Sequence, residues 1–251
     1  MIDIHSHIIP GIDDGAKNEE MALEMLRIAE RCGTKKIVAT PHFMRGRFDY
    51  EYSEVTGEVD KLRKLAKDNN INIEIYQGQE VYYSDRIIKY YDAGIIGTIN
   101  GTKYMLIELP MLEFNLDEVI DNLYELQLKG ITPIIAHPER YRPFIKKPSL
   151  INKLINEGCL FQLNAGSVTG GFGKDVKKTA EIYLMNRVYN FVGSDGHRDS
   201  KRDTDLTKFL NIVEKEDISL FKESSEAMLN NEEVEFVGNT IKERKKILGI
   251  F

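Results

Sequence analysis

The feature that most constrains the fold is a regular alternation of short apolar runs with longer amphipathic runs. The apolar runs predict strands at 2–5, 36–41, 73–81, 103–109, 132–137, 160–164 and 189–194. Between them, apolar residues at helical spacing predict helices near 18–32, 53–69, 84–92, 115–129, 148–157 and 174–187. Apolar strands that alternate with helices are typical of a parallel sheet buried on both faces.

These units follow one another without a Pro-, Gly- or Ser-rich linker, which predicts a single α/β domain over residues 1–251. A distorted (β/α)7 TIM-like barrel is the favoured architecture, and an open doubly wound sheet is the alternative. After residue 200 the pattern becomes helical, and we expect helices at 203–215 and 238–247 to complete the outer ring.

Composition excludes several classes of function. A formal net charge of −6 argues against a broad basic face that binds nucleic acid. Cys32 and Cys159 are too few for a disulfide scaffold, and both are expected to be small buried hydrophobes. Neither begins a cysteine-phosphatase loop, because Val38 and Ala165 stand where the loop arginine would be. With no secretory signal and no apolar run of about 18 residues, a cytoplasmic protein that does not span a membrane is expected.

Residues that can bind a metal ion follow nearly every predicted strand. They include all five histidines of the chain. Because the C-terminal ends of barrel strands meet on one face, we expect these side chains to converge there. The candidate ligands are His5, His7, Asp14, His42, Glu80, Glu108, His137, Asp195 and His197.

The spacing and chemistry of these candidates suggest the kind of site. Side chains alternate along a strand, so His5 and His7 should point the same way while Ser6 points opposite. Imidazoles and carboxylates without cysteine suit Mn²⁺, Fe²⁺ or Zn²⁺, and the candidates exceed what one ion needs. We therefore expect two or three divalent ions, an arrangement that supports in-line displacement at phosphorus despite the acidic chain.

Two arginines are candidate phosphate ligands. Arg140 follows His137 and Arg202 follows His197, each in a loop expected on the same face. A guanidinium fork matches pairs of phosphate oxygens. The alternative is that these loop arginines are solvated or paired with acids, for which the neighbouring Glu139 and Asp203 are candidates. Four further arginines are weaker candidates, namely Arg198, Arg142, Arg45 and Arg47.

Six motifs, in order, resemble the PHP (polymerase and histidinol phosphatase) family over nearly the whole chain. They read DIHSH, DDG, ATPH, GQE, IAHPER and SDGH. The closer likeness is to the bacterial capsule- and exopolysaccharide-operon tyrosine phosphatases of that family. It is carried by IDIHSHIIPGIDDGA, TKYMLIELP, LQLKGITPIIAHPERY, NAGSVTGGFGK and RKKILGIF.

This resemblance implies a PHP-type barrel with a trinuclear site, usually of manganese, that hydrolyses phosphotyrosine in proteins. One ion would be held by His5, His7, Glu80 and Asp195, with Glu80 bridging to a second ion bound by Glu108 and His137. The third would be held by Asp14, His42 and His197, and Arg140 and Arg202 would bind the phosphate. Asp13 is expected to be a turn residue, and segment 43–53 is less family-like and receives no role.

The expected reaction is attack on phosphotyrosine by a metal-activated hydroxide, with Asp14 or His42 as candidate acid for the leaving phenolate. The substrate implied by the resemblance is a tyrosine autokinase of capsular or exopolysaccharide biosynthesis. The alternatives are a histidinol phosphatase or other small phosphomonoesterase, a nuclease, and a non-catalytic regulatory module that keeps the metal.

Overall fold

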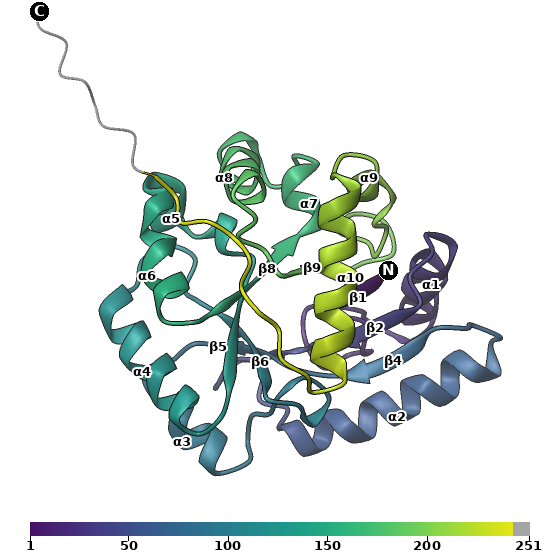
Figure 1. The fold of residues 1–251 in the computed structure, drawn as a ribbon. Helices are drawn as coiled ribbons and strands as arrows, with labels where there is room; N and C mark the ends of the chain where they lie inside the picture. Colours follow the sequence, from purple (N-terminus) through teal and green to yellow (C-terminus); the bar gives the residue numbers. More distant parts are fainter. Residues whose placement is uncertain (243–251) are drawn as a thin grey trace, which may run out of the picture.

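The computed structural model describes residues 1–242, and its strands alternate with helices along the chain (Figure 1). The strands are β1 (Ile2–Ser6), β2 (Lys36–Ala39), β3 (His42–Phe43), β4 (Glu74–Gln77), β5 (Glu80–Tyr82), β6 (Tyr104–Glu108), β7 (Thr132–Ala136), β8 (Leu160–Asn164) and β9 (Phe191–Gly193). The helices are α1 (Glu19–Arg31), α2 (Tyr52–Asp68), α3 (Ile87–Asp92), α4 (Leu116–Leu128), α5 (Arg142–Lys146), α6 (Ile151–Asn156), α7 (Ala165–Val168), α8 (Lys174–Met185), α9 (Thr207–Leu210) and α10 (Lys215–Leu229). Single 3-10 turns lie at Ile99–Gly101, Pro138–Arg140 and Pro148–Leu150.

The strands form a curled, parallel arrangement in two sheets, ordered β1-β2-β4 and β3-β5-β6-β7-β8-β9. Backbone hydrogen bonds also join β1 to the segment after β9. The Asp195 N–H donates to the His5 carbonyl at 2.8 Å, and the His7 N–H donates to the Gly196 carbonyl at 2.9 Å. The first strand, which carries the HSH motif, therefore lies beside the last.

An apolar core fills the inner side of the curled arrangement. It is built by alternate residues of the strands, such as Ile4, Leu106 and Ile134. Helix α10 and the segment that follows it cross the face shown in Figure 1, and Met228 joins the inner core. This core ends where the polar residues of the C-terminal strand ends begin.

Two predicted strands are interrupted. The predicted strand 36–41 is shorter in the structure, where β2 ends at Ala39 and a separate strand, β3, begins at His42, whereas segment 73–81 divides into β4 and β5. Pro41 has no N–H to donate to a ladder, which explains the first break. The breaks stay side by side, because the Gly78 N–H donates to the Ala39 carbonyl at 2.9 Å. The two breaks change the direction of the chain just before His42 and Glu80.

The predictions for the C-terminal part were wrong in their positions. Within 203–215 only Thr207–Leu210 is an α-helix, and the long helix is Lys215–Leu229 instead. The side chains of Asp203 and Asp205 accept backbone N–H groups two residues on, at 3.0 and 2.7 Å, so they favour turns over a helix. Of the predicted helix 238–247, residues 238–242 are not helical and the remainder lies outside the described residues.

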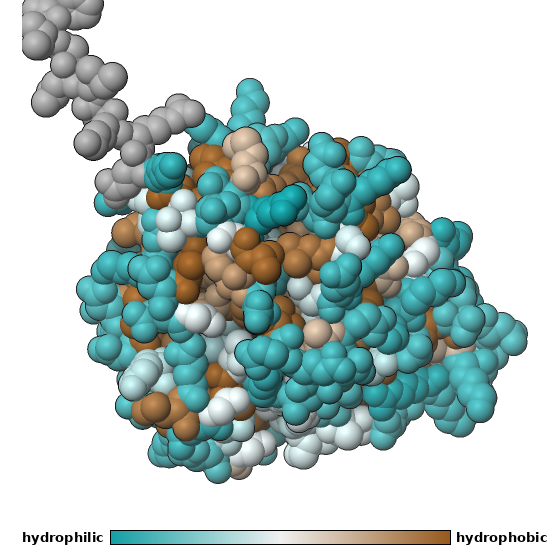
Figure 2. Space-filling view, in the orientation of Figure 1, coloured by the Kyte–Doolittle hydropathy of each residue, from teal (hydrophilic) through white to brown (hydrophobic). Residues whose placement is uncertain are grey.

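None of the helices within residues 1–242 is both long and apolar enough to cross a bilayer. On the face shown in Figure 2, hydrophobic residues lie in small patches bordered by hydrophilic ones.

Candidate metal centre

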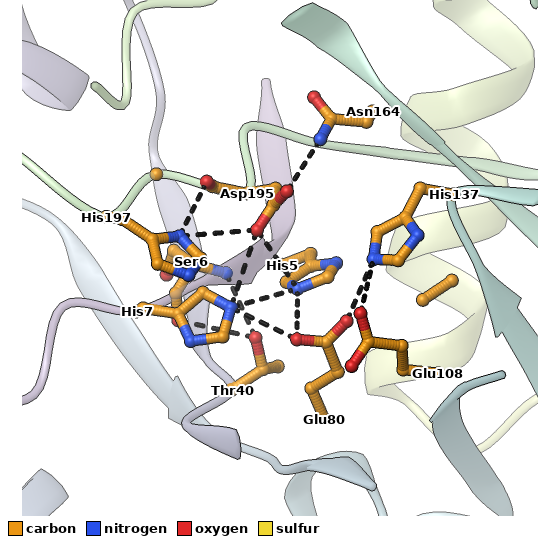
Figure 3. A network of polar contacts seen from close by, with 12 residues as sticks. His5, Ser6, His7, Thr40, Glu80, Glu108, His137, Asn164, Asp195 and His197 are labelled. Atoms are coloured by element: carbon orange, nitrogen blue, oxygen red, sulfur yellow. Dashed lines mark hydrogen bonds and ion pairs between the residues drawn. The ribbon is translucent and has the colours of Figure 1, made fainter. Parts of the chain in front are cut away.

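The nine candidate ligands converge at the C-terminal ends of the strands, although they are far apart in the sequence. Figure 3 labels all of them except Asp14 and His42. His5 lies in β1, His42 begins β3, Glu80 begins β5 and Glu108 ends β6. The others follow β1, β7 or β9 directly or in the next loop, namely His7, Asp14, His137, Asp195 and His197. Most of them line a cavity of about 600 Å³, whereas His5 and His7 lie buried behind it.

Glu80 is the centre of this cluster. Its Oε2 atom lies 3.1 Å from His5 Nε2, 3.2 Å from His7 Nε2 and 3.0 Å from His42 Nδ1. Its Oε1 atom lies 2.9 Å from His137 Nε2. Glu80 is fully buried, yet among the residues described its Oε2 makes no hydrogen bond. Several ring nitrogens thus point at one unsatisfied carboxylate oxygen, which is the arrangement that a cation between them would satisfy.

Three overlapping groups of side chains bring their donor atoms within the reach of one ion in the described part of the chain. They are His5, His7 and Glu80; His42, Glu80 and Glu108; and His7, Asp14, His42 and His197. The predicted orientation of the HSH motif is confirmed, because His5 Nε2 and His7 Nε2 are 3.1 Å apart while Ser6 Oγ donates to the Val38 carbonyl. His42 differs from the expectation in lying close to Glu80 as well as to Asp14.

A second layer of side chains orients the imidazoles. His7 Nδ1 donates to Asp13 Oδ2 at 2.7 Å, and His5 Nδ1 donates to Gln162 Oε1 at 2.9 Å. His197 Nδ1 donates to the Asp195 carbonyl at 3.0 Å. With Nδ1 protonated in this way, each Nε2 keeps a lone pair directed into the cluster.

Without a bound cation, the buried charged groups of the cluster shift the pKa values of one another. Burial and the nearby charge of Glu80 raise the pKa of Glu108 to about 8. Burial and the Arg140 guanidinium lower the pKa of His137 to about 4. Burial alone would raise the pKa of Asp195, but His5 and the nearby arginines hold it well below its usual range. The buried carboxylates of Glu80 and Glu108 lie close together, and such a pair favours the binding of a divalent cation.

Both predicted phosphate arginines reach the cluster. Arg140 Nη1 donates to Asp195 Oδ2 at 2.7 Å, and Arg202 Nη2 donates to the same oxygen at 2.8 Å. Both guanidinium groups also lie beside the Phe172 ring, at 4.5 and 5.7 Å from its centroid. They therefore stand together on one wall of the cavity, held by a carboxylate and by an aromatic face.

The backbone is strained where the cluster is assembled. His137 and Asp195 adopt positive φ values of 31° and 51°, which are uncommon for residues with a side chain. Gly193 must lack a side chain, because a Cβ there would lie 2.4 Å from the Cβ of His5. Close approach of β9 to β1 and two unusual backbone conformations thus aim the ligand side chains.

The neighbouring acids proposed as partners of the arginines have other partners. Glu139 accepts from the Asn164 N–H at 3.1 Å and from the Tyr189 hydroxyl at 3.0 Å, so this alternative was wrong for Arg140. Asp203 accepts from the Asp205 N–H. The structure brings both arginines to Asp195 instead.

The weaker candidates divide by position. Arg198 binds the carbonyls of Asp14 and Gly15, and Arg45 pairs with Asp49. Arg47 and Arg142 line the outer part of the cavity. Cys159 is buried as expected, and burial raises the pKa of its thiol to about 12, whereas Cys32 is only partly buried and donates to Asp205.

Sequence reasoning missed the residues that orient the ligands. Asp13 is in a loop, as predicted, but it is almost completely buried and holds His7. Gln162 accepts from His5 and from the His137 N–H, and Asn164 donates to Asp195 Oδ2 at 2.7 Å. A signal was present, because Gln162 and Asn164 alternate with apolar residues in the strand LFQLN and so point to one face near its C-terminal end.

Comparison with known proteins gives a consistent result. The family model for capsular polysaccharide synthesis, CpsB/CapC, matches residues 1–240. The tyrosine-protein phosphatase YwqE of Bacillus subtilis is 34% identical over 256 residues, covering 100% of both chains. The tyrosine-protein phosphatase CpsB of Streptococcus pneumoniae is 31% identical, covering 86% of this chain and 90% of that protein.

Solved structures agree with these sequence relatives. A chain from the crystal structures of B. subtilis YwqE and S. pneumoniae CpsB, unique metal-dependent tyrosine phosphatases, has a TM-score of 0.91. It is 32% identical, and the match covers 97% of this chain and 100% of that one. Histidinol phosphate phosphatase from Lactococcus lactis shares the fold more distantly, with a TM-score of 0.52, 16% identity and coverage of 89% and 93%. The chain therefore belongs to the CpsB/CapC family of capsular polysaccharide synthesis proteins.

Proposed function

We propose that this chain is a metal-dependent protein-tyrosine phosphatase, a phosphoric monoester hydrolase that does not use cysteine. The observation that carries the proposal is the convergence of Arg140, Arg202 and the buried cluster around Glu80 on one cavity. The family relatives named above are tyrosine-protein phosphatases, which supports phosphotyrosine as the substrate. The high thiol pKa and burial of Cys159 argue against a cysteine nucleophile.

We propose the division of the metal ligands among three ions that the family resemblance implies. One ion would be held by His5, His7, Glu80 and Asp195, and a second by Glu80, Glu108 and His137. In addition, His7 lies close to the ligands of the third ion, and His42 lies close to those of the second. Asp14, His42 and His197 would hold the third. Mn²⁺ is the ion we propose, because hard and borderline donors predominate in the set.

When bound, the divalent ions activate water as a nucleophile and neutralise charge on the phosphoryl group. Arg140 and Arg202 bind the remaining phosphoryl oxygens, and their contacts with Asp195 and Phe172 keep them oriented before the substrate arrives. Asp14 and His42 are the most exposed of the cluster and are the two candidate acids for the leaving phenolic oxygen, a role open to either residue only when it is not engaged as a metal ligand. Because the phenol of tyrosine has a pKa of about 10, its phenolate leaves with only modest assistance from an acid.

We also propose the finer points of fold and context. The hydrogen bonds between β1 and the segment after β9 support closure of the strands into a distorted (β/α)7 barrel forming a single PHP-type domain. The natural substrate proposed is a cytoplasmic tyrosine autokinase of capsular or exopolysaccharide biosynthesis. Membership of a capsular polysaccharide synthesis family supports that context.

The test is hydrolysis of a phosphotyrosine peptide by the purified full chain, stripped with a chelator and reloaded with Mn²⁺. We expect turnover that requires the metal and survives iodoacetamide. Arg140→Ala should lower kcat/KM roughly 100-fold, because one donor to the phosphoryl oxygens is lost. Arg31→Ala is the matched control, since Arg31 is exposed and its ion-pair partner is the surface residue Glu24.

Histidinol phosphate and a phosphoserine peptide are the comparison substrates. Faster turnover of histidinol phosphate than of phosphotyrosine would refute the proposed substrate class. Metal binding with no turnover of any of these substrates would instead identify the non-catalytic regulatory module.

A further inference from the structure

The cavity extends beyond the metal cluster into an outer part of different chemistry. It is lined by Met44, Arg47 and Phe48 of one turn, by the loop 110–113 and by Arg142. We call these residues the mouth. Leu112, in the mouth, is 67% exposed, which is unusual for a large apolar side chain. A surface of this kind, continuous with an active site, is suited to contact more of a substrate than its phosphate.

The turn of the mouth is held in one conformation. The N–H groups of Met44 and Phe48 each donate to the carbonyl of the other, at 2.9 and 2.8 Å. Gly46 supplies a positive φ of 84° at the tip, and its N–H donates to the Asp49 carboxylate at 2.9 Å. Part of segment 43–53, which is less family-like, therefore forms a hydrogen-bonded wall of the cavity.

The turn is also fixed to the metal cluster. The Phe48 ring stacks on the ring of the candidate ligand His42, with centroids 5.5 Å apart and planes 13° apart. The Arg47 guanidinium lies 4.9 Å from the Phe48 ring centroid. In the second segment of the mouth, the Arg142 backbone N–H donates to the Met111 carbonyl at 2.9 Å, and this hydrogen bond joins the start of α5 to the loop 110–113. Arg47 and Arg142 thus have defined positions above the phosphate-binding part.

The charges of the mouth are unbalanced. Arg47 and Arg142 are both exposed, and neither side chain forms an ion pair within residues 1–242. Glu113 is the acid among the residues of the mouth. The neighbouring Arg45, by contrast, pairs with Asp49 and does not line the cavity. Two unpaired guanidinium forks beside an anion-binding site are complementary to further anionic groups on the ligand.

We propose that the mouth binds the peptide that flanks the phosphotyrosine and selects acidic flanks through Arg47 and Arg142. This inference rests on the proposed phosphatase function. A glutamate carboxylate or a second phosphoryl group presents the same anionic oxygens to a guanidinium fork. Neutral or basic flanks would leave the forks unpaired and bind more weakly.

The experiment compares peptides of one length that carry a central phosphotyrosine and either Glu, Gln or a second phosphotyrosine in the flanks. The Mn²⁺-loaded full chain should favour the Glu-flanked over the Gln-flanked peptide by about tenfold in kcat/KM, mainly through KM. Arg47→Ala and Arg142→Ala should each lower this ratio about threefold, and the double variant should bring it close to one. Arg45→Ala, which removes the same charge from the same turn, should keep the wild-type ratio.

The outcomes separate this inference from the function on which it rests. Hydrolysis of all peptides with no preference, or a preference that survives in the double variant, overturns the role of the mouth and leaves the phosphatase function intact. Failure to hydrolyse any phosphotyrosine peptide overturns both. A preference for the doubly phosphorylated peptide that needs the two arginines supports the mouth with phosphoryl groups as its anions, and the same result with Glu supports carboxylates.

Discussion

Asp13 offers the sharpest test of how the site is organised, because it binds no predicted ion yet holds a predicted ligand. Its Oδ2 atom accepts from His7 Nδ1 at 2.7 Å and from the His42 N–H at 3.0 Å. Its Oδ1 atom accepts from the Gly15 N–H at 2.8 Å. The Asp13→Asn variant keeps the shape but replaces one acceptor oxygen with a donor. Whichever way the amide turns, at least one N–H group faces another donor in a buried place.

The size of the effect follows from these contacts. A hydrogen bond to a charged group contributes about 1.5–3 kcal/mol. Loss of a carboxylate that orients a metal-binding histidine lowers metal affinity roughly 10- to 100-fold. We therefore expect Asp13→Asn to bind Mn²⁺ that much more weakly, and we expect the activity lost at limiting metal to recover in part at high metal.

Isothermal titration of the chelator-stripped protein with Mn²⁺ measures the affinity, and thermal unfolding of the metal-free protein checks the fold. Asp199→Asn is the control, because Asp199 is exposed and lies two residues after His197. An affinity of Asp13→Asn within about twofold of the wild type would refute the reasoning that this carboxylate orients His7.

Three further predictions concern the same cluster. Gly193→Ala should destabilise the protein by about 1–3 kcal/mol in urea unfolding, because the new Cβ would overlap the Cβ of His5; an unchanged midpoint would contradict the close approach of β9 to β1. Phe172→Ala should raise KM for a phosphotyrosine peptide several-fold, about 1 kcal/mol, by releasing Arg140 from its aromatic contact; Phe172→Tyr should restore it, and a change confined to thermal stability would indicate a structural role alone. In the metal-free protein Glu108 keeps its proton up to about pH 8, so a cation must displace that proton. Mn²⁺ affinity should thus fall by up to about tenfold per pH unit on acidification below this value, with proton release seen by calorimetry in buffers of different ionisation enthalpy, whereas a pH-independent affinity would exclude this coupling.

Much of the fold was predictable because it depends on local pattern. Apolar strands and amphipathic helices gave most elements of the sheet and its covering helices close to where they lie. The prediction was wrong after residue 200, where Asp203 and Asp205 bind the backbone locally and the long helix begins only at Lys215. Side chains that compete for backbone N–H groups are not visible in hydrophobic periodicity.

The sequence by itself determined which residues gather at the strand ends, because parallel strands present those ends on one face and all five histidines occur there. It also determined that His5 and His7 point the same way, because that follows from the pleat.

Only the tertiary structure decided the partners of those residues. Asp195 receives both arginines, Gln162 orients His5, and the mouth carries two guanidinium groups that form no ion pair among residues 1–242. Each of these contacts joins residues from different strands or loops. Their pairing depends on the register of the sheet, the strained turns at His137 and Asp195 and the close approach at Gly193, none of which a one-dimensional pattern encodes.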